Sequence, residues 1–408
     1  MIHKLLNKNT SKIFNYLLKT KVYFFKGIKK NDLLIFDDIF PNPISGFRQE
    51  EYSQLLLHFE KSKIISTGAA YRIVNSPETQ FKEDIENFKI KFPDLKNKLF
   101  KKSRFININT KLFYCIFINN IYNNIIWLEK HKIPFVFTLY PGGGFQVDDE
   151  ACNFKLKKVL ESPQFRKVIV TQQFTFDYLI KNKFCTSDKI NFIFGGVVPQ
   201  VSLKKDLSKK LSYLINKPTL DICFCAAKYM PKGIDKGYDV FIELAHLLNQ
   251  KFDFVRFHVI GGFDQNDIDV SNLNNNIKFY GYKNFDNLNQ IFKSIDIIVS
   301  PNKPFYLKKG AFDGFPLGTV VEAVLNGVAA LLSDQLNQNN IFDNYKEIVI
   351  IENNANKIEI EILNLINNPE KLYNISENGR LKFVEVYSNQ MQMKPRIELL
   401  ENEIINSK

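Results

Sequence analysis

The sequence lacks any uninterrupted apolar run of about 18 residues, the length that a membrane-spanning helix needs. The nearest candidate, residues 111–130 (KLFYCIFINNIYNNIIWLEK), is interrupted by four asparagines and indicates a buried core helix. The first 30 residues contain eight lysines and no acidic residue, but they lack a compact apolar segment and a small-residue cleavage site. We therefore expect neither a transmembrane segment nor a secretory signal.

Cysteine and histidine are both scarce, with five of each in 408 residues. The cysteines have neither the framework of a secreted disulfide protein nor the paired spacing of a zinc site; they lie at positions 115, 152, 185, 223 and 225. No histidine pairs with another histidine, a cysteine or an acid at the helical spacing of a metal site. We therefore expect a reducing cytoplasmic setting and no structural metal.

Acidic residues are outnumbered, because 43 Asp and Glu face 55 Lys and Arg, for a formal net charge of +12. This excess favours anionic partners such as nucleotides, lipid headgroups or nucleic acid, without choosing among them. Residues 1–30 form either a basic amphipathic segment that lies on an anionic membrane surface or a solvated lysine-rich arm. A composition of 45% hydrophobic and 24% charged residues is typical of a soluble globular protein.

Short apolar runs alternate with helical patterns along the chain, which predicts βα units and parallel sheets. In the first half we expect strands at 32–37, 63–67, 134–140, 167–171 and 190–194, and helices at 47–60, 111–131 and 173–182. In the second half we expect strands at 219–226, 254–262, 277–281, 296–301, 328–334 and 347–352, and helices at 237–249, 285–294, 318–326 and 355–367. Two further helices are expected near 370–386 and 390–405.

A polar, lysine-rich passage, residues 202–218, separates the two halves. We assign residues 31–198 to a first domain, 199–385 to a second domain and 386–408 to a C-terminal helix. The predicted fold class is α/β, with two doubly wound domains that face each other across a cleft. Ligands of open α/β sheets bind beyond the carboxyl ends of the strands, so the strand-to-helix loops are the candidate sites.

One candidate loop, residues 302–316, carries Asp313 and precedes a helix that begins near Leu317. The free N–H groups and the dipole of such a helix start favour phosphate binding. Glu322 lies within this otherwise apolar helix. Thr319-x-x-Glu322 also matches a capping box, and Asp313 is also a typical turn residue, so chemistry alone leaves both interpretations open.

A second loop, residues 228–237, follows the first strand of the same half and carries Lys228 and Lys236. A lone lysine says little in a chain with 55 basic residues. Two lysines on this loop, however, can face the same crevice as the helix start near Leu317. Ammonium and N–H groups that converge in this way suit a diphosphate, both for binding and for stabilising it as a leaving group.

Residues 190–385 resemble the retaining glycosyltransferases of family 4, which have the GT-B fold of two facing Rossmann-like domains. The resemblance rests on Lys228, where the family more often has arginine, and on Lys236-Gly237 before a helix. It also rests on the stretches HVIGGF, IKFYGY, DIIVSP and DGFPLGTVVEAVLNGVAALLSD. The N-terminal half matches only in its pattern of strands and helices and in IFGGVVP at its exit.

The resemblance implies an acceptor domain at 31–198 and a nucleotide-sugar domain at 199–385. Lys228 and Lys236 would bind the donor diphosphate, Glu322 would hold the ribose, and Asp313 would contact the donor sugar, so that Asp313 and Lys236 carry the catalysis. The turn and the helix start would shape the phosphate site through Gly314, Phe315, Pro316, Leu317, Gly318 and Thr319. The first acid is Asp where the family has Glu, and eight residues separate it from the second, one more than usual.

The acceptor-side candidates are glycines that let the backbone approach a ligand, and one cation. Gly46 and Arg48 follow the first strand, and Arg48 could meet an anionic group; the others, after the strand at 134–140, are Gly142, Gly143 and Gly144. Ordinary tight turns are the competing interpretation. The Pro-Gly-Gly-Gly run also lacks the spacing of a dinucleotide fingerprint.

An acidic cluster, Asp264-Gln-Asn-Asp267-Ile-Asp269, contains an acid-x-acid element like the metal-binding motif of the other large glycosyltransferase fold. The polar residues around it indicate an exposed loop instead. We therefore expect transfer without a metal, and no cofactor apart from the nucleotide-sugar substrate.

The leading hypothesis is a cytoplasmic glycosyltransferase that moves a sugar from a UDP- or GDP-sugar to a glycan or lipid-linked acceptor, with retention, in bacterial-type envelope polysaccharide synthesis. Binding of residues 1–30 to an anionic membrane would place it on the inner face of the plasma membrane. The alternatives are a catalytically inactive nucleotide-sugar binder and a basic nucleic-acid-binding protein. Because the lysines are spread along the whole chain, we expect no nucleic-acid partner.

Overall fold

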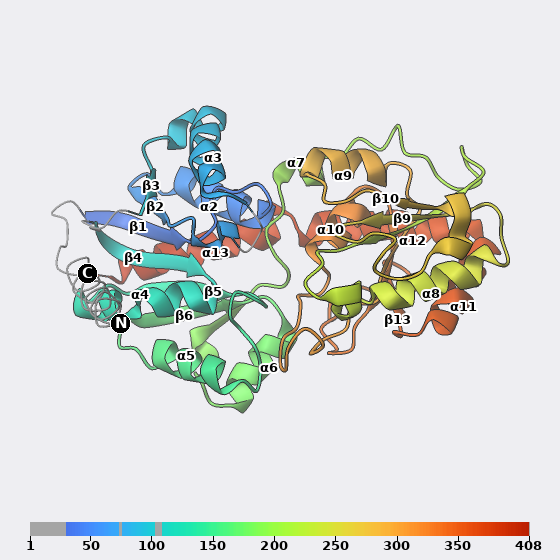
Figure 1. The fold of residues 1–408 in the computed structure, drawn as a ribbon. Coiled ribbons are helices and arrows are strands. Elements are labelled where there is room, and N and C mark those ends of the chain that lie inside the picture. The colour runs from blue at the N-terminus through green and yellow to red at the C-terminus, as the bar shows by residue number, and fades with distance from the viewer. Residues whose placement is uncertain (1–29, 73–75, 103–107, 408) are drawn as a thin grey trace, which may run out of the picture.

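The computed structural model describes residues 30–72, 76–102 and 108–407. Two lobes lie side by side, and each is a parallel sheet with helices on its faces (Figure 1). The predicted basic segment 1–30 lies outside the described residues, except for Lys30. In the described part of the chain, no helix combines the length and the apolar character needed to cross a membrane.

The first sheet has the strand order β3-β2-β1-β4-β5-β6-β7, and every pair in it is parallel. Its strands are β1 (Lys30–Asp37), β2 (Ser62–Ser66), β3 (Leu99–Lys101), β4 (Asn109–Ile116), β5 (Phe135–Leu139), β6 (Phe165–Val170) and β7 (Ile190–Phe192). Its helices are α2 (Gly46–His58), α3 (Glu78–Lys91), α4 (Ile118–Lys130), α5 (Glu150–Leu160) and α6 (Gln173–Lys181).

The prediction of one helix over residues 111–131 is wrong in its first part, because β4 occupies that part and only the rest forms α4. β4 is the middle strand of the sheet, and Leu112 to Ile116 are buried on both faces. A strand that is buried on both faces shows no alternation of polar and apolar residues. Phe117, at φ 75°, separates the strand from the helix. The strand β3 and the helices α3 and α5 were not predicted.

The second sheet has the order β10-β9-β8-β11-β12-β13, again with parallel pairs only. All six strands predicted for the second half are present; they are β8 (Leu220–Cys225), β9 (Val255–Ile260), β10 (Ile277–Phe279), β11 (Ile297–Ser300), β12 (Ala329–Ser333) and β13 (Val349–Ile351). Its predicted helices are confirmed as α8 (Tyr238–Asn249), α9 (Phe285–Phe292), α10 (Gly318–Leu325) and α11 (Ala355–Ile366). A short helix, α7 (Gln200–Leu203), lies in the connection between the lobes.

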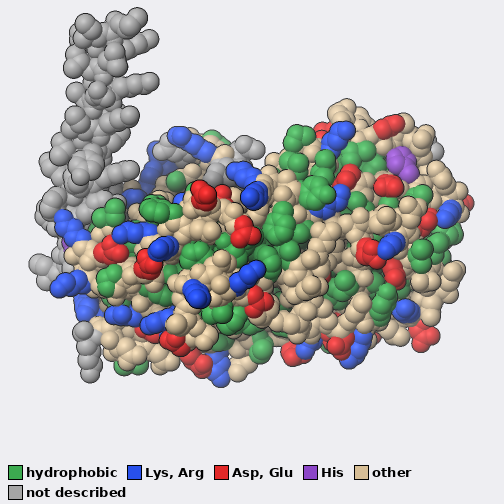
Figure 2. Space-filling model, turned by 90° about the horizontal axis from the view of Figure 1, so that it is seen from below, with side chains coloured by type: hydrophobic (Ala, Val, Ile, Leu, Met, Phe, Trp, Pro, Cys, Tyr) green, Lys and Arg blue, Asp and Glu red, His purple; other side chains and the backbone are tan. Residues whose placement is uncertain are grey.

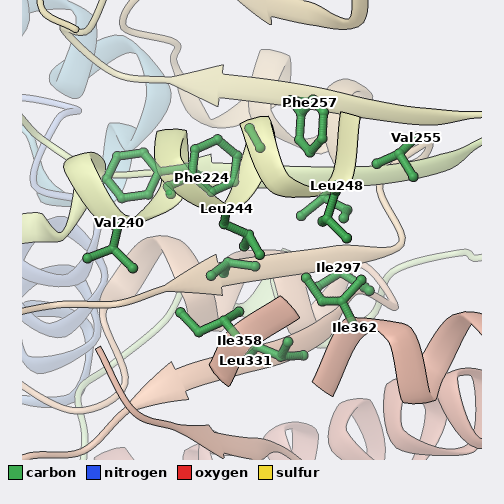
Figure 3. Close-up of a cluster of buried hydrophobic side chains, with 14 of the residues drawn as sticks. Phe224, Val240, Leu244, Leu248, Val255, Phe257, Ile297, Leu331, Ile358 and Ile362 are labelled. Carbon is green, nitrogen blue, oxygen red and sulfur yellow. The ribbon is translucent and has the colours of Figure 1, made fainter. Parts of the chain in front are cut away.

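Side chains from the centre of the second sheet and from the helices α8 and α11 form a continuous core. Figure 3 shows Phe224 of β8, Leu244 of α8, Leu331 of β12 and Ile358 of α11 among its members, and each is at most 1% exposed. This core occupies one face of the sheet, and the predicted buried helix α10 packs on the other face. The second sheet, whose carboxyl strand ends carry the candidate loops, is therefore packed on both faces by buried side chains.

The two final helices belong to different lobes. The helix α12 (Pro369–Val386) packs on the second sheet, whereas α13 (Asn389–Ile405) returns to the first lobe and contacts β4 and α2 (Figure 1). Arg396 of α13 is fully buried; its Nη2 donates to the hydroxyl of Tyr140 (3.1 Å), and its Nε lies 3.7 Å from Oε2 of Glu51. This buried charge pair ties the end of the chain to the first lobe.

Candidate functional site

Two strand-to-helix loops of the second lobe meet at the carboxyl end of its sheet. One follows β8 and contains Lys228 and Lys236, and the other follows β11 and contains Asp313. Gly237 lies in the left-handed region at φ 72°, and a Cβ placed on it would come within 2.0 Å of the carbonyl oxygen of Pro301. Only glycine allows this close approach, so the two loops touch through their backbones.

Lys236 is a buried cation at the point where the two loops meet. Its side chain is 5% exposed, its ammonium contacts Oδ2 of Asp313, and the ring of Tyr229 lies 5.1 Å away. This contact brings Lys236 and the Asp313 loop together, whereas the convergence of both lysines and the helix start near Leu317 on one crevice stays a prediction. Because an unpaired charge is costly to bury, the carboxylate accounts for the position of the ammonium group.

Asp235, which sequence reasoning did not single out, lies near the same ammonium group. Its Oδ2 is 3.8 Å from Nζ of Lys236, and neither carboxylate oxygen has a hydrogen-bond partner among the described residues. Burial raises the pKa of Asp235, against the opposing effect of Lys236. Lys236 therefore has two carboxylate neighbours, one buried and one partly exposed.

Lys228 also contacts a carboxylate, Oδ1 of Asp267, and its backbone N–H donates to the hydroxyl of Tyr282 (3.3 Å). Asp267 belongs to the acidic cluster that the sequence placed in an exposed loop. Asp264 and Asp269 are exposed as expected, but the side chain of Asp267 is only 12% exposed because it turns towards Lys228. Among the described residues, no group of three or more His, Cys, Asp or Glu is arranged to hold a metal ion.

The helix α10 begins at Gly318 with Leu317 as its cap residue, and Gly327, at φ 74°, ends it. The capping-box interpretation is wrong, because Thr319 lies inside the helix and its Oγ1 donates to the carbonyl of Cys225 (2.7 Å). Thr319 therefore fastens the helix start to the end of β8. The N–H groups of the first turn remain without a side-chain cap.

Glu322 projects from α10 towards α7, where Ser202 Oγ donates to its Oε1 (2.9 Å). Its Oε2 is buried and has no hydrogen-bond partner among the described residues. Burial raises the pKa of Glu322, and the hydrogen bond from Ser202 and the charge of Lys205 oppose this only in part. A buried acceptor without a donor is available for a ligand hydroxyl group.

The turn at residues 313–317 lines a pocket at the carboxyl ends of β11 and β12. Five of the predicted residues contribute to its wall, namely Asp313, Gly314, Phe315, Pro316 and Leu317. The wall does not include Lys228, Lys236, Gly318, Thr319 or Glu322, which lie on the surrounding loops and on α10. The predicted donor residues therefore do not all line this pocket, and neither lysine contributes to its wall.

Gln172, at the carboxyl end of β6, connects the first lobe to this turn and was missed by sequence reasoning. Its Nε2 donates to the carbonyl of Phe315 (3.3 Å), and the N–H of Phe315 donates to its Oε1 (3.1 Å). Nearby, the N–H of Val147 donates to the carbonyl of Gly310 (2.9 Å). The Asp313 loop therefore lies directly against the first lobe.

On the acceptor side, Arg48 has its charge compensated within the protein. Nη1 of Arg48 lies 3.0 Å from Oδ2 of Asp37 and also contacts Asp38, and the guanidinium carbon lies 4.6 Å from the centre of the Phe117 ring. An anionic ligand at Arg48 would therefore have to compete with these two carboxylates for the guanidinium group. Gly46 begins α2, and a Cβ there would meet only Pro199, at 3.9 Å.

The three acceptor-side glycines form a tight turn, in which the N–H of Phe145 donates to the carbonyl of Gly142 (3.0 Å). A Cβ on Gly143 would come within 2.1 Å of Phe117, and one on Gly144 within 2.3 Å of Asn119. Gly142 has open space around it. Close packing on α4 therefore explains two of the glycines, as the tight-turn interpretation expects, whereas Gly142 faces outward.

Basic and acidic side chains are interspersed on the face of the molecule shown in Figure 2. On that face, Lys and Arg side chains do not form one continuous stripe. An interface that follows a nucleic-acid backbone would need such a stripe.

The family model described as "Glycosyl transferases group 1" matches residues 232–382, which include Lys236, Asp313 and Glu322. No curated protein sequence matches the chain. Among solved structures, the sucrose-phosphate synthase of Thermosynechococcus elongatus has a TM-score of 0.61 and 12% identity, over 93% of this chain and 100% of that one.

The structure of Anabaena Alr3699/HepE in complex with UDP has a TM-score of 0.59 and 12% identity, over 92% of this chain and 100% of that one. TarM has a TM-score of 0.53 and 19% identity over 71% of this chain, which spans 54% of the length of TarM. These similarities confirm the predicted fold, the GT-B arrangement of two facing Rossmann-like domains. The matched domain and the shared fold together support a glycosyltransferase enzyme.

Proposed function

We propose that the protein transfers a sugar from a nucleotide-diphosphate sugar to a glycan or lipid-linked acceptor, with retention of configuration. The observation that carries this proposal is the contact between Lys236 and Asp313, which brings a cation and an acceptor together beside the start of α10. In the reaction, the bond from the anomeric carbon to the diphosphate breaks and a bond to the acceptor oxygen forms. The proton of the acceptor hydroxyl leaves with the diphosphate.

Positive charge at the site would stabilise the leaving diphosphate. Lys236 is almost fully buried, and a charge in such a place acts more strongly than one in water. Lys228 and the uncapped N–H groups at the start of α10 would add to this field. Since lysines and helix amides supply the positive charge, we propose that transfer needs no metal ion, so that activity should persist in EDTA.

The carboxylates would recognise the polyhydroxylated parts of the donor. The unpartnered Oε2 of Glu322 is a suitable acceptor for a ribose hydroxyl, and the partly exposed Asp313 is suitable for hydroxyls of the donor sugar. The similarity to a structure that contains UDP makes UDP-sugars the first donors to test and GDP-sugars the second. The acceptor would lie on the first lobe, near the outward-facing Gly142.

We further propose a cytoplasmic role in envelope polysaccharide synthesis, on the inner face of the plasma membrane. The net charge of +12 and the acid-free first 30 residues support attraction to an anionic lipid surface. Sedimentation of the full chain with vesicles that contain anionic phospholipid, compared with neutral vesicles, tests this part separately from catalysis.

The test of the activity is release of the nucleotide diphosphate from a panel of UDP- and GDP-sugars. We expect Lys236→Ala to lower kcat by about 100-fold or more, since it removes a charge that stabilises the leaving group. We expect Glu322→Gln to weaken donor binding by about 10-fold, because an ionised acceptor bonds a hydroxyl more strongly than an amide does.

A matched control is Lys251→Ala, which removes a lysine whose ion pair with Glu359 (2.8 Å) lies beyond the end of α8, outside the site. This variant should retain wild-type turnover. Turnover near the wild-type rate in both Lys236→Ala and Glu322→Gln would refute the assignment.

A further inference from the structure

Each of the two lysines assigned to the donor diphosphate contacts a carboxylate from another loop of the same lobe. Lys236 contacts Asp313, 77 residues away in sequence, and Lys228 contacts Asp267, 39 residues away. Neither pair follows from the periodicity of a helix or from a turn. That both cations of one site are paired in this way indicates a shared role for the two acids.

The ammonium group of Lys236 has one buried and one partly exposed carboxylate beside it. The side chain of Asp235 is 3% exposed, whereas that of Asp313 is 34% exposed. A diphosphate at the same ammonium group would bring further negative charge against Asp313, and like charges at this range repel. Asp313 is therefore the group that a diphosphate would displace into the space beside it.

The pair at Lys228 has the opposite arrangement. Oδ2 of Asp267 accepts the N–H of Asp264 (3.1 Å), so the carboxylate is fixed within its turn. Lys228 is the more exposed partner, at 26% against 12%. To reach a diphosphate, the ammonium group would have to leave Asp267.

We propose that Asp267 and Asp313 are internal counter-ions that compete with the donor diphosphate for Lys228 and Lys236, and that Asp313, once displaced, accepts hydrogen bonds from the donor sugar. This inference rests on the proposed function and deepens it. It gives a role to Asp267, which the donor site defined above does not use. It also separates the two acids, because only Asp313 regains a partner when a sugar is attached to the diphosphate.

The two acids should therefore have different effects on binding. Removing the charge of Asp267 should tighten binding of a nucleoside diphosphate and of its sugar conjugate alike, by about 3- to 10-fold, the range expected for an ion pair that is only partly exposed. Removing the charge of Asp313 should tighten binding of the free nucleoside diphosphate by a similar factor. It should also abolish any preference for the sugar conjugate over the free diphosphate.

The experiment is isothermal titration of the full chain with UDP, GDP, UDP-glucose and GDP-mannose, for the wild type, Asp267→Asn and Asp313→Asn. Asparagine keeps the size of the side chain, and circular dichroism with thermal melting checks that each variant is folded. Asp267→Ser and Asp313→Ser repeat the measurement with a second replacement. The control is Glu359→Gln, which discharges the acid paired with Lys251 outside the site and should leave every dissociation constant unchanged.

The outcomes distinguish the two proposals. If the wild type binds a nucleoside diphosphate, and Lys236→Ala weakens it, but the folded Asn and Ser variants bind no more tightly than the wild type, the counter-ion inference is overturned and the proposed function stands. If the wild type binds none of the four probes, the proposed function fails and the inference fails with it. Tighter binding in both Asn variants, with the sugar preference lost only in Asp313→Asn, supports both.

Discussion

Replacement of Gln172 by leucine should lower the activity, although Gln172 lies in the lobe that does not carry the lysines. Its side-chain amide makes two hydrogen bonds with the backbone of Phe315, across 143 residues of sequence. Both residues are buried, at 3% and 5% exposure. Leucine fills a similar volume but offers neither a donor nor an acceptor, so the turn beside Asp313 loses its support from the first lobe.

The size of the effect follows from these two bonds. A buried hydrogen bond contributes a net of about 1 kcal/mol, so the arrangement in which the lobes share this contact should lose about 2 kcal/mol. If that arrangement is the one that reacts, kcat/KM falls by about 30-fold, since about 1.4 kcal/mol corresponds to a factor of ten. The backbone N–H and carbonyl left without partners would raise this figure.

The assay is kcat/KM for release of UDP from the preferred UDP-sugar, together with the dissociation constant of UDP. Because Lys228 and Lys236 lie on the second lobe, UDP binding should change by less than about 3-fold. The matched control is Gln173→Leu, the same change one residue along, where Nε2 donates to the carboxylate of the exposed Asp177 (2.9 Å). Activity of folded Gln172→Leu within 3-fold of the wild type, or an equal loss in the control, would refute the reasoning.

Two further predictions concern stability. Arg396→Leu leaves the carboxylate of Glu51 buried without its counter-charge, so the free energy of unfolding in urea should fall by about 3–5 kcal/mol. Adding Glu51→Gln to this variant should restore part of the lost stability. Equal stability of the single and double variants would contradict this. Burial raises the pKa of Glu322 above 4.5, so the folded state binds the proton more tightly than the unfolded state, and the ionised carboxylate costs stability as the pH rises above that value. Glu322→Gln should therefore melt above the wild type at pH 8 and level with it at pH 4, and the same difference at both pH values would show that ionisation is not the cause.

The second lobe was predicted from sequence almost element by element, whereas in the first lobe five of the seven strands and the helices α2 and α6 were predicted but β3, β4, α3 and α5 were not. In the second lobe, turn residues and helix caps bound each short apolar run, such as the Gly-Gly after β9 and the Gly327 that ends α10. In the first lobe, β4 passes into α4 through an unbroken apolar stretch, and a doubly buried strand has no periodicity of its own. Local pattern could not separate the two elements.

The same distinction holds for the candidate site. The sequence places lysines, acids and a helix start on loops that follow strands, and parallel strands carry such loops to one edge of a sheet. It could not assign partners. Arg48 was a candidate for contact with an anionic ligand, with an ordinary turn as the alternative, and it is paired with Asp37 and Asp38. Gln172 had no signal in the sequence, because one amide side chain cannot be distinguished there from any other.

By itself, the sequence determined the α/β class, the succession of strands and helices in the second lobe, and the loops on which the charged groups lie, because these follow from residue spacing along a short segment. Only the tertiary structure decided which acidic and basic side chains form ion pairs. It set Asp313 against Lys236, Asp267 against Lys228 and the returning Arg396 against Glu51, since contacts between residues far apart in the chain depend on how whole lobes pack, and no local pattern records them.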